Sequence, residues 1–583
     1  METVSFLRKE EGQSFIELIV ASGIFLIIVG GIAYVILTTY VLNEEARDRT
    51  QALLIAQEGL EAARSIRDNN FGALRGGDHG VTLSPDKKWV FSGTSDLVQN
   101  KFTRTVAIAD LAAERKKITS RVSWNFRGGS GRNVELVTFL SNWQMTLPGG
   151  MLVYGDGGTT SDVIRYRILD ADNGTWGPVL AAADVNIATT NRALRMARVY
   201  ASPTRNEKIL ISRHYNVAMQ MQFIYAQVFN GSSWSNVVLL SFLDSNAFLD
   251  VRNVDGTYLE NGDFMTVYSD NTTTPKFRVW NGTSWSSQIA TQNTGGIPTY
   301  IVARARPGTN EVMVAVFGQQ RDTNTEYFNG GSYTSANWTL HAQHARNTPV
   351  TTKQFIDFEW SANSPVRGAL IYSDAANDIA MNIKIWTADG AGGGSWSGTA
   401  NTANQAARLG AMRASSRFGA NEVVACDKDA AGTPHIICSR SNFTPSWDPV
   451  NQQIASATDN GIQRSFDIGF ESLSGDLALG VYSDTAATPK LKKYNAGTNT
   501  WDASATSLNS VGSTLETVTI IPKEDSDDMM VLLANTVQDL YSIVWDGAND
   551  TVYTIPAGKA FSAHGTNGSA DEEFWFDFAW DRF

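Results

Sequence analysis

The C-terminal segment WFDFAW, residues 575–580, decides the fold of most of this chain because its pattern recurs three times upstream. SFDIGF at 465–470 and FIDFEW at 355–360 share its single aspartate among apolar residues, and we align AFLDV at 247–251 as the fourth copy. Short apolar and aromatic runs bounded by turn residues are typical of β-strands. The aspartates of the four copies follow one another at intervals of 107, 110 and 110 residues: Asp250, Asp357, Asp467 and Asp577.

The placing of these copies leaves one strand missing at the start of the repeats and one left over at the end. The segment MLVYGD at 151–156 has no such strand before it, whereas WFDFAW has no repeat after it. Pairing of the two segments would close a ring of sheets and remove a free sheet edge, as in a β-propeller. A linear array of β-repeats is the alternative, but it does not explain the missing and the extra strand. We therefore predict an all-β propeller over residues 151–583, whose C-terminal strand closes the first blade.

A second repeat sets the expected number of blades. A turn rich in Gly, Asn or Ser precedes a tryptophan every 51–58 residues, at Trp176, Trp234, Trp285, Trp338, Trp396, Trp447 and Trp501. This period fits a four-stranded blade and is longer than that of ankyrin, tetratricopeptide or leucine-rich repeats. Two blade types alternate, one with Tyr-x-Asp and the other with Asn-Glu or Asp-Asp, so four pairs predict eight blades. The tryptophans are expected to pack between blades.

The first strands of the second blade type carry arginine instead of aspartate: Arg198, Arg304 and Arg413, with none in the fourth copy at 515–520. If the first strands line the channel, these arginines alternate with the four aspartates around it. Two interpretations stay open, a belt of ion pairs that holds the blades together and a polar ligand pocket. Arginines with acids and tyrosines in a propeller also resemble sialidases, although blade number and motif order differ. A glycan-acting enzyme is therefore an alternative function.

Other polar residues give weaker indications. Four aspartates follow the second strands, on the face where we expect the mouth of the channel: Asp156, Asp270, Asp374 and Asp484. Glycan or Ca²⁺ contacts are conceivable there, but capping of turns is the simpler role. Because no calcium-loop or zinc motif is complete, we predict no metal and no other cofactor. Cys426 and Cys438 fall on neighbouring strands of one blade, where a disulfide and two buried thiols remain alternatives.

The N-terminal region has a different composition. FIELIVASGIFLIIVGGIAYVILTTYVL, residues 15–42, holds a single charged residue, Glu17. As a helix it would span ~42 Å, more than the ~30 Å hydrocarbon layer of a bilayer. The helical pattern continues to residue 70 with apolar residues spaced among charges, so one helix over 13–70 is membrane-embedded first and amphipathic afterwards. A cleaved secretory signal has a shorter apolar core of about 7–15 residues, and an ordinary signal-anchor helix is the remaining alternative.

An acid within such a helix is costly, so Glu17 needs a partner. It lies five residues after Gly12 in the segment GQSFIE, which follows a short charged leader, residues 1–12. This arrangement resembles the type IV prepilin signal. The resemblance implies that prepilin peptidase cleaves after Gly12 and methylates Gln13, and that Glu17 pairs with the N-terminal amine of a neighbouring subunit. Gln13 departs from the commoner Phe or Met at that position.

The resemblance extends over a small antiparallel sheet that we expect after the helix, within residues 71–144. Alternating segments at 102–111, 116–126 and 133–143 predict its strands, and residues 145–150 the linker to the propeller. A long helix on such a sheet is the α+β architecture of pilins. Residues 13–143 thus resemble a minor pilin or a pseudopilin, which implies insertion in the cytoplasmic membrane, with the leader inside, before assembly into a surface filament.

The distribution of charge limits the possible ligands of the predicted propeller. Residues 1–150 are nearly balanced, whereas the rest of the chain has a net charge of −13, which argues against a nucleic-acid ligand. We predict a minor pilin that presents the propeller for adhesion to a glycan or protein ligand, at the tip of the filament because so large a head is hard to repeat along it. A secretion pseudopilin that recruits cargo and the glycan-acting enzyme are the alternatives; the chain itself is expected not to be an enzyme, but a substrate of prepilin peptidase.

Overall fold

The computed structural model of the chain divides into two compact units, Met1–Met145 and Thr146–Phe583. The boundary lies at the predicted linker, of which only Gly149 and Gly150 are described. Gly12, Asp156 and Asp250 lie outside the described residues. The structure describes residues 13–69, 73–84, 87–112, 115–127, 129–141, 149–155, 163–170, 175–185, 192–216, 219–244, 251–345, 354–389, 392–448, 451–456, 458, 464–484, 486–537, 539–547, 550–554 and 575–582.

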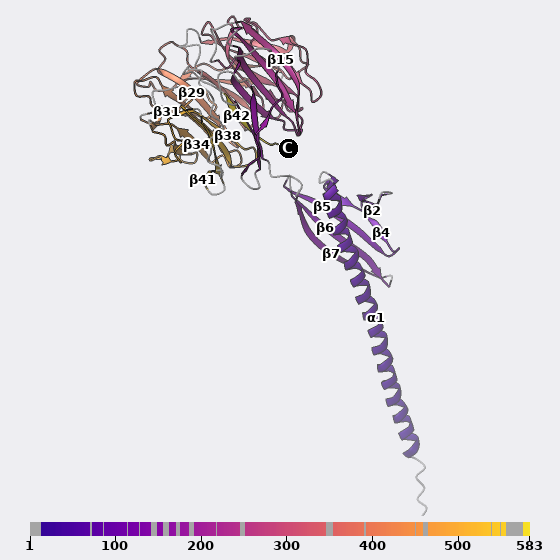
Figure 1. Ribbon diagram of the computed structural model, residues 1–583. Coiled ribbons are helices and arrows are strands. Elements are labelled where there is room, and N and C mark those ends of the chain that lie inside the picture. Colours follow the sequence, from indigo (N-terminus) through magenta and orange to yellow (C-terminus); the bar gives the residue numbers. More distant parts are fainter. Residues whose placement is uncertain are drawn as a thin grey trace, which may run out of the picture. The chain divides into compact units, whose positions relative to one another are not determined.

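The first unit is built on one long helix, α1 (Gln13–Asn69) (Figure 1). From Phe15 to Leu42 its apolar side chains are exposed on all sides, as is Glu17. By length and composition α1 could cross a membrane. A helix that is apolar all round needs an apolar environment, which the described residues of the first unit do not supply to this half of α1.

An antiparallel sheet accompanies the second half of the helix (Figure 1). Its order is β1-β5-β6-β7 with β4 also paired to β5, and β2 and β3 form a separate pair. The bounds are β1 (Gly77–His79), β2 (Val81–Leu83), β3 (Trp89–Phe91), β4 (Asp96–Val98), β5 (Phe102–Ala112), β6 (Arg115–Phe126) and β7 (Ser130–Ser141). The three strands expected from sequence correspond to β5, β6 and β7.

Small apolar residues let the helix approach this sheet closely. Ala52, Ala56 and Ala63 of α1 are fully buried against it. A Cβ on Gly59 would lie 2.5 Å from the Ser120 hydroxyl, so the helix could not pack as closely with a larger residue there. Arg104 of β5 is buried beneath the helix and pairs with Glu58 of α1, and also with a carboxylate of β4. The second half of α1 is thus fixed to the sheet while the first half is free of it.

The second unit is an all-β propeller. Its described residues form eight antiparallel sheets (Figure 1). From the innermost strand outward they are β42 (Phe576–Trp580), β8 (Gly150–Gly155), β9 (Ile164–Asp170) with β10 (Thr175–Trp176) and β11 (Leu180–Ala181); β12 (Arg192–Ala201), β13 (Lys208–Asn216), β14 (Met221–Phe229), β15 (Trp234–Asp244); β16 (Val254–Tyr258), β17 (Phe264–Tyr268), β18 (Lys276–Trp280), β19 (Ile289–Ala290); β20 (Pro298–Ala305), β21 (Val312–Gly318), β22 (Thr323–Phe328), β23 (Trp338–Ala345); β24 (Ile356–Trp360), β25 (Arg367–Tyr372), β26 (Asn382–Ala388) with β27 (Gly394–Trp396) and β28 (Ala400–Asn401); β29 (Leu409–Ser416), β30 (Val423–Asp429), β31 (Ile436–Ser441), β32 (Gln452–Ala455); β33 (Phe466–Phe470), β34 (Leu477–Tyr482), β35 (Lys490–Asn495) with β36 (Thr500–Trp501) and β37 (Thr506–Ser507); and β38 (Leu515–Pro522), β39 (Met529–Asn535), β40 (Leu540–Asp546), β41 (Thr551–Thr554).

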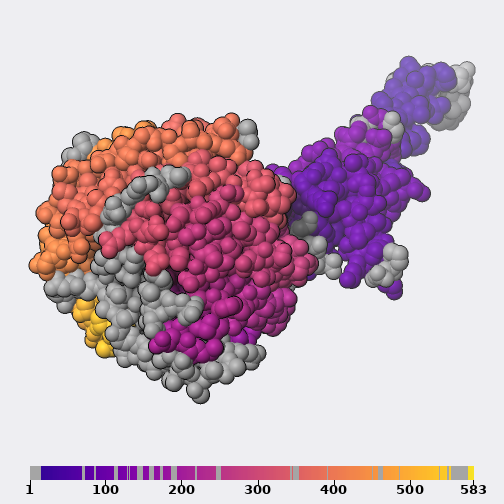
Figure 2. Space-filling view, turned by 90° about the horizontal axis from the view of Figure 1, so that it is seen from above, coloured from indigo at the N-terminus to yellow at the C-terminus, as the bar shows by residue number. Residues whose placement is uncertain are grey.

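The innermost strands form a closed ring. Each contacts the next in the order β42, β12, β16, β20, β24, β29, β33, β38 and back to β42. Figure 2 shows the same order, because the colours of the sequence pass round this unit from magenta to orange. The C-terminal strand β42 pairs antiparallel with β8, so that Asp577 lies opposite Val153. The chain therefore closes its first sheet with its last strand, as WFDFAW predicts.

The turn tryptophans pack within their own sheets as well as between sheets. The ring of Trp285 lies 5.6 Å from that of Trp280 on the preceding strand, and Trp501 lies 5.3 Å from Tyr494 in the same way. The indole N–H of Trp285 reaches the preceding sheet, where it donates to the carbonyl of Asn236. The sequence predicted the contact of Trp285 with the preceding blade. It did not predict the ring contacts within a blade, because Trp280 and Tyr494 lie on the strand before the turn and are not part of the turn motif.

The closing strand should carry a large share of the stability of the second unit. The Trp580 side chain is buried against Phe578, and its indole N–H donates to the carbonyl of Ile521 in β38 at 2.9 Å. We expect Trp580→Ala to destabilise the unit by about 3–5 kcal/mol, measured by urea unfolding followed by circular dichroism. Val537→Ala, at an exposed apolar residue of the same unit, should change it by less than about 0.5 kcal/mol. Equal effects of the two variants would contradict closure of the ring by β42.

Candidate functional site

Four buried aspartates tie consecutive innermost strands together around the channel. In each, one carboxylate oxygen accepts the backbone N–H of a residue on the next innermost strand at 3.0 Å. The inner edge of such a strand has no further strand to pair with, so its N–H groups need another acceptor. The four pairs are Asp577 with Val199, Asp255 with Ala303, Asp357 with Ala414, and Asp467 with Ile520.

Arginines complete this belt. The guanidinium of Arg413 pairs with Asp467 at 2.7 Å and lies 3.8 Å from Asp357, so it bridges two carboxylates. Arg198 lies 3.3 Å from Asp577, and Arg304 lies 3.4 Å from the carboxylate of Asp255. Arg198 and Arg413 thus pair with predicted aspartates, whereas Arg304 pairs with Asp255, which was not predicted.

One position of the predicted ring is wrong. The inner strand of the third sheet is β16, and Asp255 takes the place in it that Asp357 holds in β24, five residues beyond the predicted Asp250. Both segments carry an aspartate directly after an apolar residue, so the pattern alone does not separate them. A Cβ on Gly256 would lie 2.3 Å from the ring of Phe264, and only the glycine-containing segment therefore fits in this strand.

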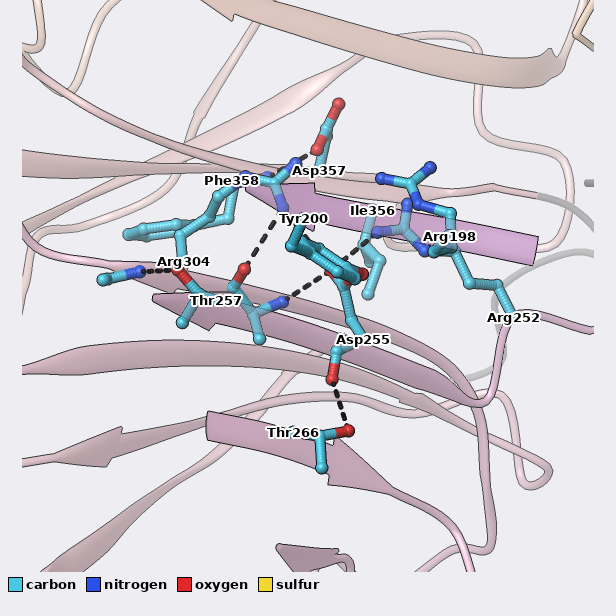
Figure 3. A network of polar contacts seen from close by, with 12 residues as sticks. Arg198, Tyr200, Arg252, Asp255, Thr257, Thr266, Arg304, Ile356, Asp357 and Phe358 are labelled. Carbon is cyan, nitrogen blue, oxygen red and sulfur yellow. Dashed lines mark hydrogen bonds and ion pairs between the residues drawn. The ribbon is translucent and has the colours of Figure 1, made fainter. Parts of the chain in front are cut away.

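Two further arginines of the channel were not predicted. Arg252 is fully buried and its guanidinium lies 2.6 Å from Asp255, as Figure 3 shows together with Tyr200, Arg198 and Arg304. Arg464 is buried three residues before Asp467, the same offset that separates Arg252 from Asp255. The motif Arg-x-x-Asp, present in two of the four copies, could have identified these two arginines from the sequence.

The predicted arginines also differ in register. Arg198 and Arg413 each precede the residue whose N–H is accepted by an aspartate, whereas Arg304 follows that residue. Thr519 holds the position of Arg198 in β38, so the arginine-free copy expected from sequence is real.

The ring encloses a cavity of about 640 Å³. All five arginines named above line this cavity. The cavity also reaches the loops that join innermost to second strands, near Phe418 and Glu471. The carboxylates of Asp255, Asp357 and Asp467 are at most 2% exposed, whereas the side chains of Arg198, Arg304 and Arg413 are 15–31% exposed. The aspartates therefore act in the wall, and the arginines face the space.

Burial and neighbouring charges set the ionisation of the channel acids. Burial opposes ionisation of Asp255, but Arg252, Arg304 and Arg198 outweigh it and hold the pKa of that carboxyl well below its ordinary value. Glu359 behaves in the opposite way: burial and then Asp357 raise its pKa to about 7, against the opposing effect of Arg304 and Arg413. Burial likewise raises the pKa of Glu471 to about 7, so two acids that line the cavity, Glu359 and Glu471, change charge near neutral pH.

The loop aspartates act as turn caps. Asp270 accepts the backbone N–H of Thr272, and Asp484 accepts that of Ala486 at 2.8 Å. Asp374 instead donates its backbone N–H to the Asp378 carboxylate, and burial followed by the negative charge of Asp378 raises the pKa of the Asp374 carboxyl. None of the three lines the cavity. Antiparallel strands put these loops at the end of the blades opposite to the loops near Phe418 and Glu471 that the cavity reaches.

The two cysteines form a disulfide, which joins β30 to β31 at directly opposed positions. This selects one of the two alternatives left by the sequence. Among the described residues, no three His, Cys, Asp or Glu side chains are grouped so that they could hold a metal ion.

No protein-family model matches the sequence, and no curated protein matches it either. The structure is similar to that of BP39L lectin from Burkholderia pseudomallei, which is 12% identical, with a TM-score of 0.43 over 62% of this chain and 98% of that chain. It is also similar to the Aleuria aurantia lectin, 11% identical, with a TM-score of 0.33 over 55% of this chain and 98% of that chain; that lectin is described as a six-bladed β-propeller. These TM-scores are too low to define a ligand or a number of blades.

The belt should be a main source of stability. Removing the Asp467 carboxylate leaves the Arg413 guanidinium buried without its nearest partner and the Ile520 N–H without an acceptor. We expect Asp467→Ala to destabilise the second unit by about 3–5 kcal/mol, measured by urea unfolding. Asp484→Ala, in an exposed turn of the same sheet, should cost less than about 1 kcal/mol. A small effect at Asp467 would mean that the belt does not hold the ring together.

Stability should also depend on pH through Glu359. Its pKa is raised to about 7 in the folded chain, so the folded state holds the proton more tightly than the unfolded state. This favours folding at low pH, and the gain is lost as pH rises from about 4.5 through 7, by about 2–3 kcal/mol. Unfolding measured from pH 5 to pH 8 should show a smaller decline in Glu359→Gln than in the parent. Glu135→Gln, on an exposed side chain of β7, is the control, and identical slopes in all three proteins would refute the assignment.

Proposed function

We propose that this protein is a minor pilin or pseudopilin of a type IV pilus-like filament. It would be held first in the cytoplasmic membrane by α1 and then assembled into a filament at the cell surface. The observation that carries the proposal is the division of α1 into two halves. The exposed first half holds Glu17 as its single charge, and the second half packs through small residues on an antiparallel sheet. Such a helix could join neighbouring subunits through one half and carry its own globular part on the other.

The propeller is then the displayed head, which we propose to be a binding module for a glycan or protein at the filament tip. The eight sheets of the described residues support eight blades. The channel aspartates accept backbone N–H groups and pair with arginines, which suits a wall that holds a ligand pocket open better than a pair of free catalytic acids. We therefore propose that the head binds its ligand without turnover. Recruitment of secreted cargo by a pseudopilin uses the same architecture and differs in the partner.

The proposal predicts specific processing. Co-expression of the full chain with a prepilin peptidase should remove residues 1–12 and add one methyl group to Gln13, as read by intact mass spectrometry. Gly12→Val should block the cut, because the peptidase needs a small residue before the bond. Glu17→Gln should be cut normally but should not enter filaments, because it removes the charge that would pair with the neighbouring N-terminal amine.

Glu45→Gln is the matched control, because it lies on the same helix but pairs with Arg132 of the sheet. It should be processed and assembled like the parent. If the parent keeps its full mass in the presence of active peptidase, the pilin assignment is wrong. If it is cut and assembled but secretion of a cargo protein fails without it, the pseudopilin role is the correct one.

A further inference from the structure

The cavity of the second unit gathers more positive charge at one end than its ion-pair belt needs. Five arginines from different strands and loops line the same space of about 640 Å³: Arg198, Arg252, Arg304, Arg413 and Arg464. The carboxylates nearest to them lie in the wall, where each already accepts a backbone N–H. A molecule in the cavity would therefore meet five guanidinium groups at this end, with Glu359 and Asp577 as the carboxyl groups that also line it.

These guanidinium groups repel one another. Burial, and then the positive charge of Arg413, lowers the pKa of Arg464 to about 10, and Arg198 acts in the same direction. Burial and Arg252 also oppose protonation of Arg198, but Asp577, Tyr200 and Asp255 outweigh them and raise its pKa. An oxyanion placed among them would relieve this repulsion, and a planar guanidinium binds carboxylate or sulfate oxygens through two parallel N–H groups.

The other end of the cavity has a different character. Phe418 lines it and is 46% exposed, whereas Trp360 and Phe470, which also line the cavity, are buried in the core. An exposed aromatic ring such as that of Phe418 accepts the C–H face of a sugar ring, while the arginines accept a charged substituent. The volume lies within the range of small-ligand pockets and is large enough for one or two sugar rings.

We propose that this cavity binds a sugar-sized ligand that carries one oxyanion, a carboxylate or a sulfate, with the anionic group held by Arg198, Arg304 and Arg413. This inference rests on the proposed function of the propeller as a binding head and names the class of its ligand. Glu359 lies beside the same arginines and sets the affinity through its own charge.

The acidic residues of the unit limit the negative charge that a ligand can carry, but they do not exclude an anionic ligand. Glu471, Glu524 and Asp525 line the cavity away from the arginines, and the chain beyond residue 150 has a net charge of −13. Exposed charges are screened over about 8 Å at physiological ionic strength, whereas buried guanidinium groups are screened much less. One anionic group can thus reach the arginines, but a polyanion would have to lie against the acids. The site selects singly charged ligands.

Three matched probes test this. The full-length chain in detergent micelles is titrated by calorimetry with glucuronate, glucose 6-sulfate and glucose, which share one ring and differ in the charged group. We expect binding of at least one of the two anions, at least tenfold tighter than that of glucose. The stronger of the two identifies carboxylate or sulfate as the natural group.

Two variants with opposite expected effects on anion affinity distinguish a binding site from a belt that is only structural. Arg304→Gln should weaken anion binding at least fivefold; it is the most exposed of the paired arginines, and Asp255 keeps Arg252 as its closer partner. Glu359→Gln should strengthen binding at pH 8 and reduce the rise in affinity that the parent shows between pH 8 and pH 6, the remainder being due to Glu471, whose pKa is also raised to about 7. The groups that face Glu359 are Asp357, Arg304, Arg413 and Ser416. Arg306→Gln, two residues beyond Arg304 and paired with Glu311, is the control and should bind as the parent does.

The outcomes are distinct. Equal affinity for glucose and both anions, or no change in either variant of a folded protein, overturns the anionic ligand. Binding of a neutral glycan or a protein by the same preparation would leave the proposed head function in place while this inference fails. Failure of peptidase processing would remove the filament role and leave the anion titration valid.

Discussion

The ring of the second unit depends on one repeated bond, the carboxylate of an innermost strand that accepts a backbone N–H from the next innermost strand. An innermost strand has one edge paired to its own sheet and one edge facing the channel, and the N–H groups of that second edge have no strand to bond. An aspartate on every second strand supplies the acceptor, so the sheets are joined in pairs. Indole groups act in the other direction: Trp360 and Trp580 donate to carbonyls of the strand before them. The alternation of two repeat types in the sequence follows from this division of roles.

Closure of the ring by the C-terminal strand and the belt of aspartates and arginines could be predicted from the sequence where a side chain has only one possible role. The aspartate in WFDFAW can occupy only an innermost strand, and its spacing from the other copies places that strand before residue 151. The choice between Asp250 and Asp255 could not be made in this way. It depends on whether the ring of Phe264 lies over a glycine, and that contact joins two strands rather than neighbouring residues in sequence.

The missed arginines show a related limit. Arg252 and Arg464 precede their strands, outside the alternating pattern that identifies a strand. Their side chains are buried because the ring brings both chain segments to the same channel, and burial of a charge cannot be inferred from a loop-like sequence. In the first unit the main element could be predicted, but its contacts could not. The helix was predictable from composition alone, but the close approach at Gly59 and the buried Arg104 depend on the sheet that covers the helix.

The distribution of charge in the propeller explains why the channel is both a support and a candidate site. A belt of ion pairs would be complete with as many arginines as aspartates, each pair neutral and closed to water. Here the aspartates direct their oxygens to backbone N–H groups, so each carboxylate satisfies a peptide group and an arginine at once. The side chains of Arg198, Arg304 and Arg413 nevertheless stay 15–31% exposed and line the cavity. The same bond that holds consecutive strands together therefore fixes these arginines at the surface of the cavity, inside an otherwise acidic unit.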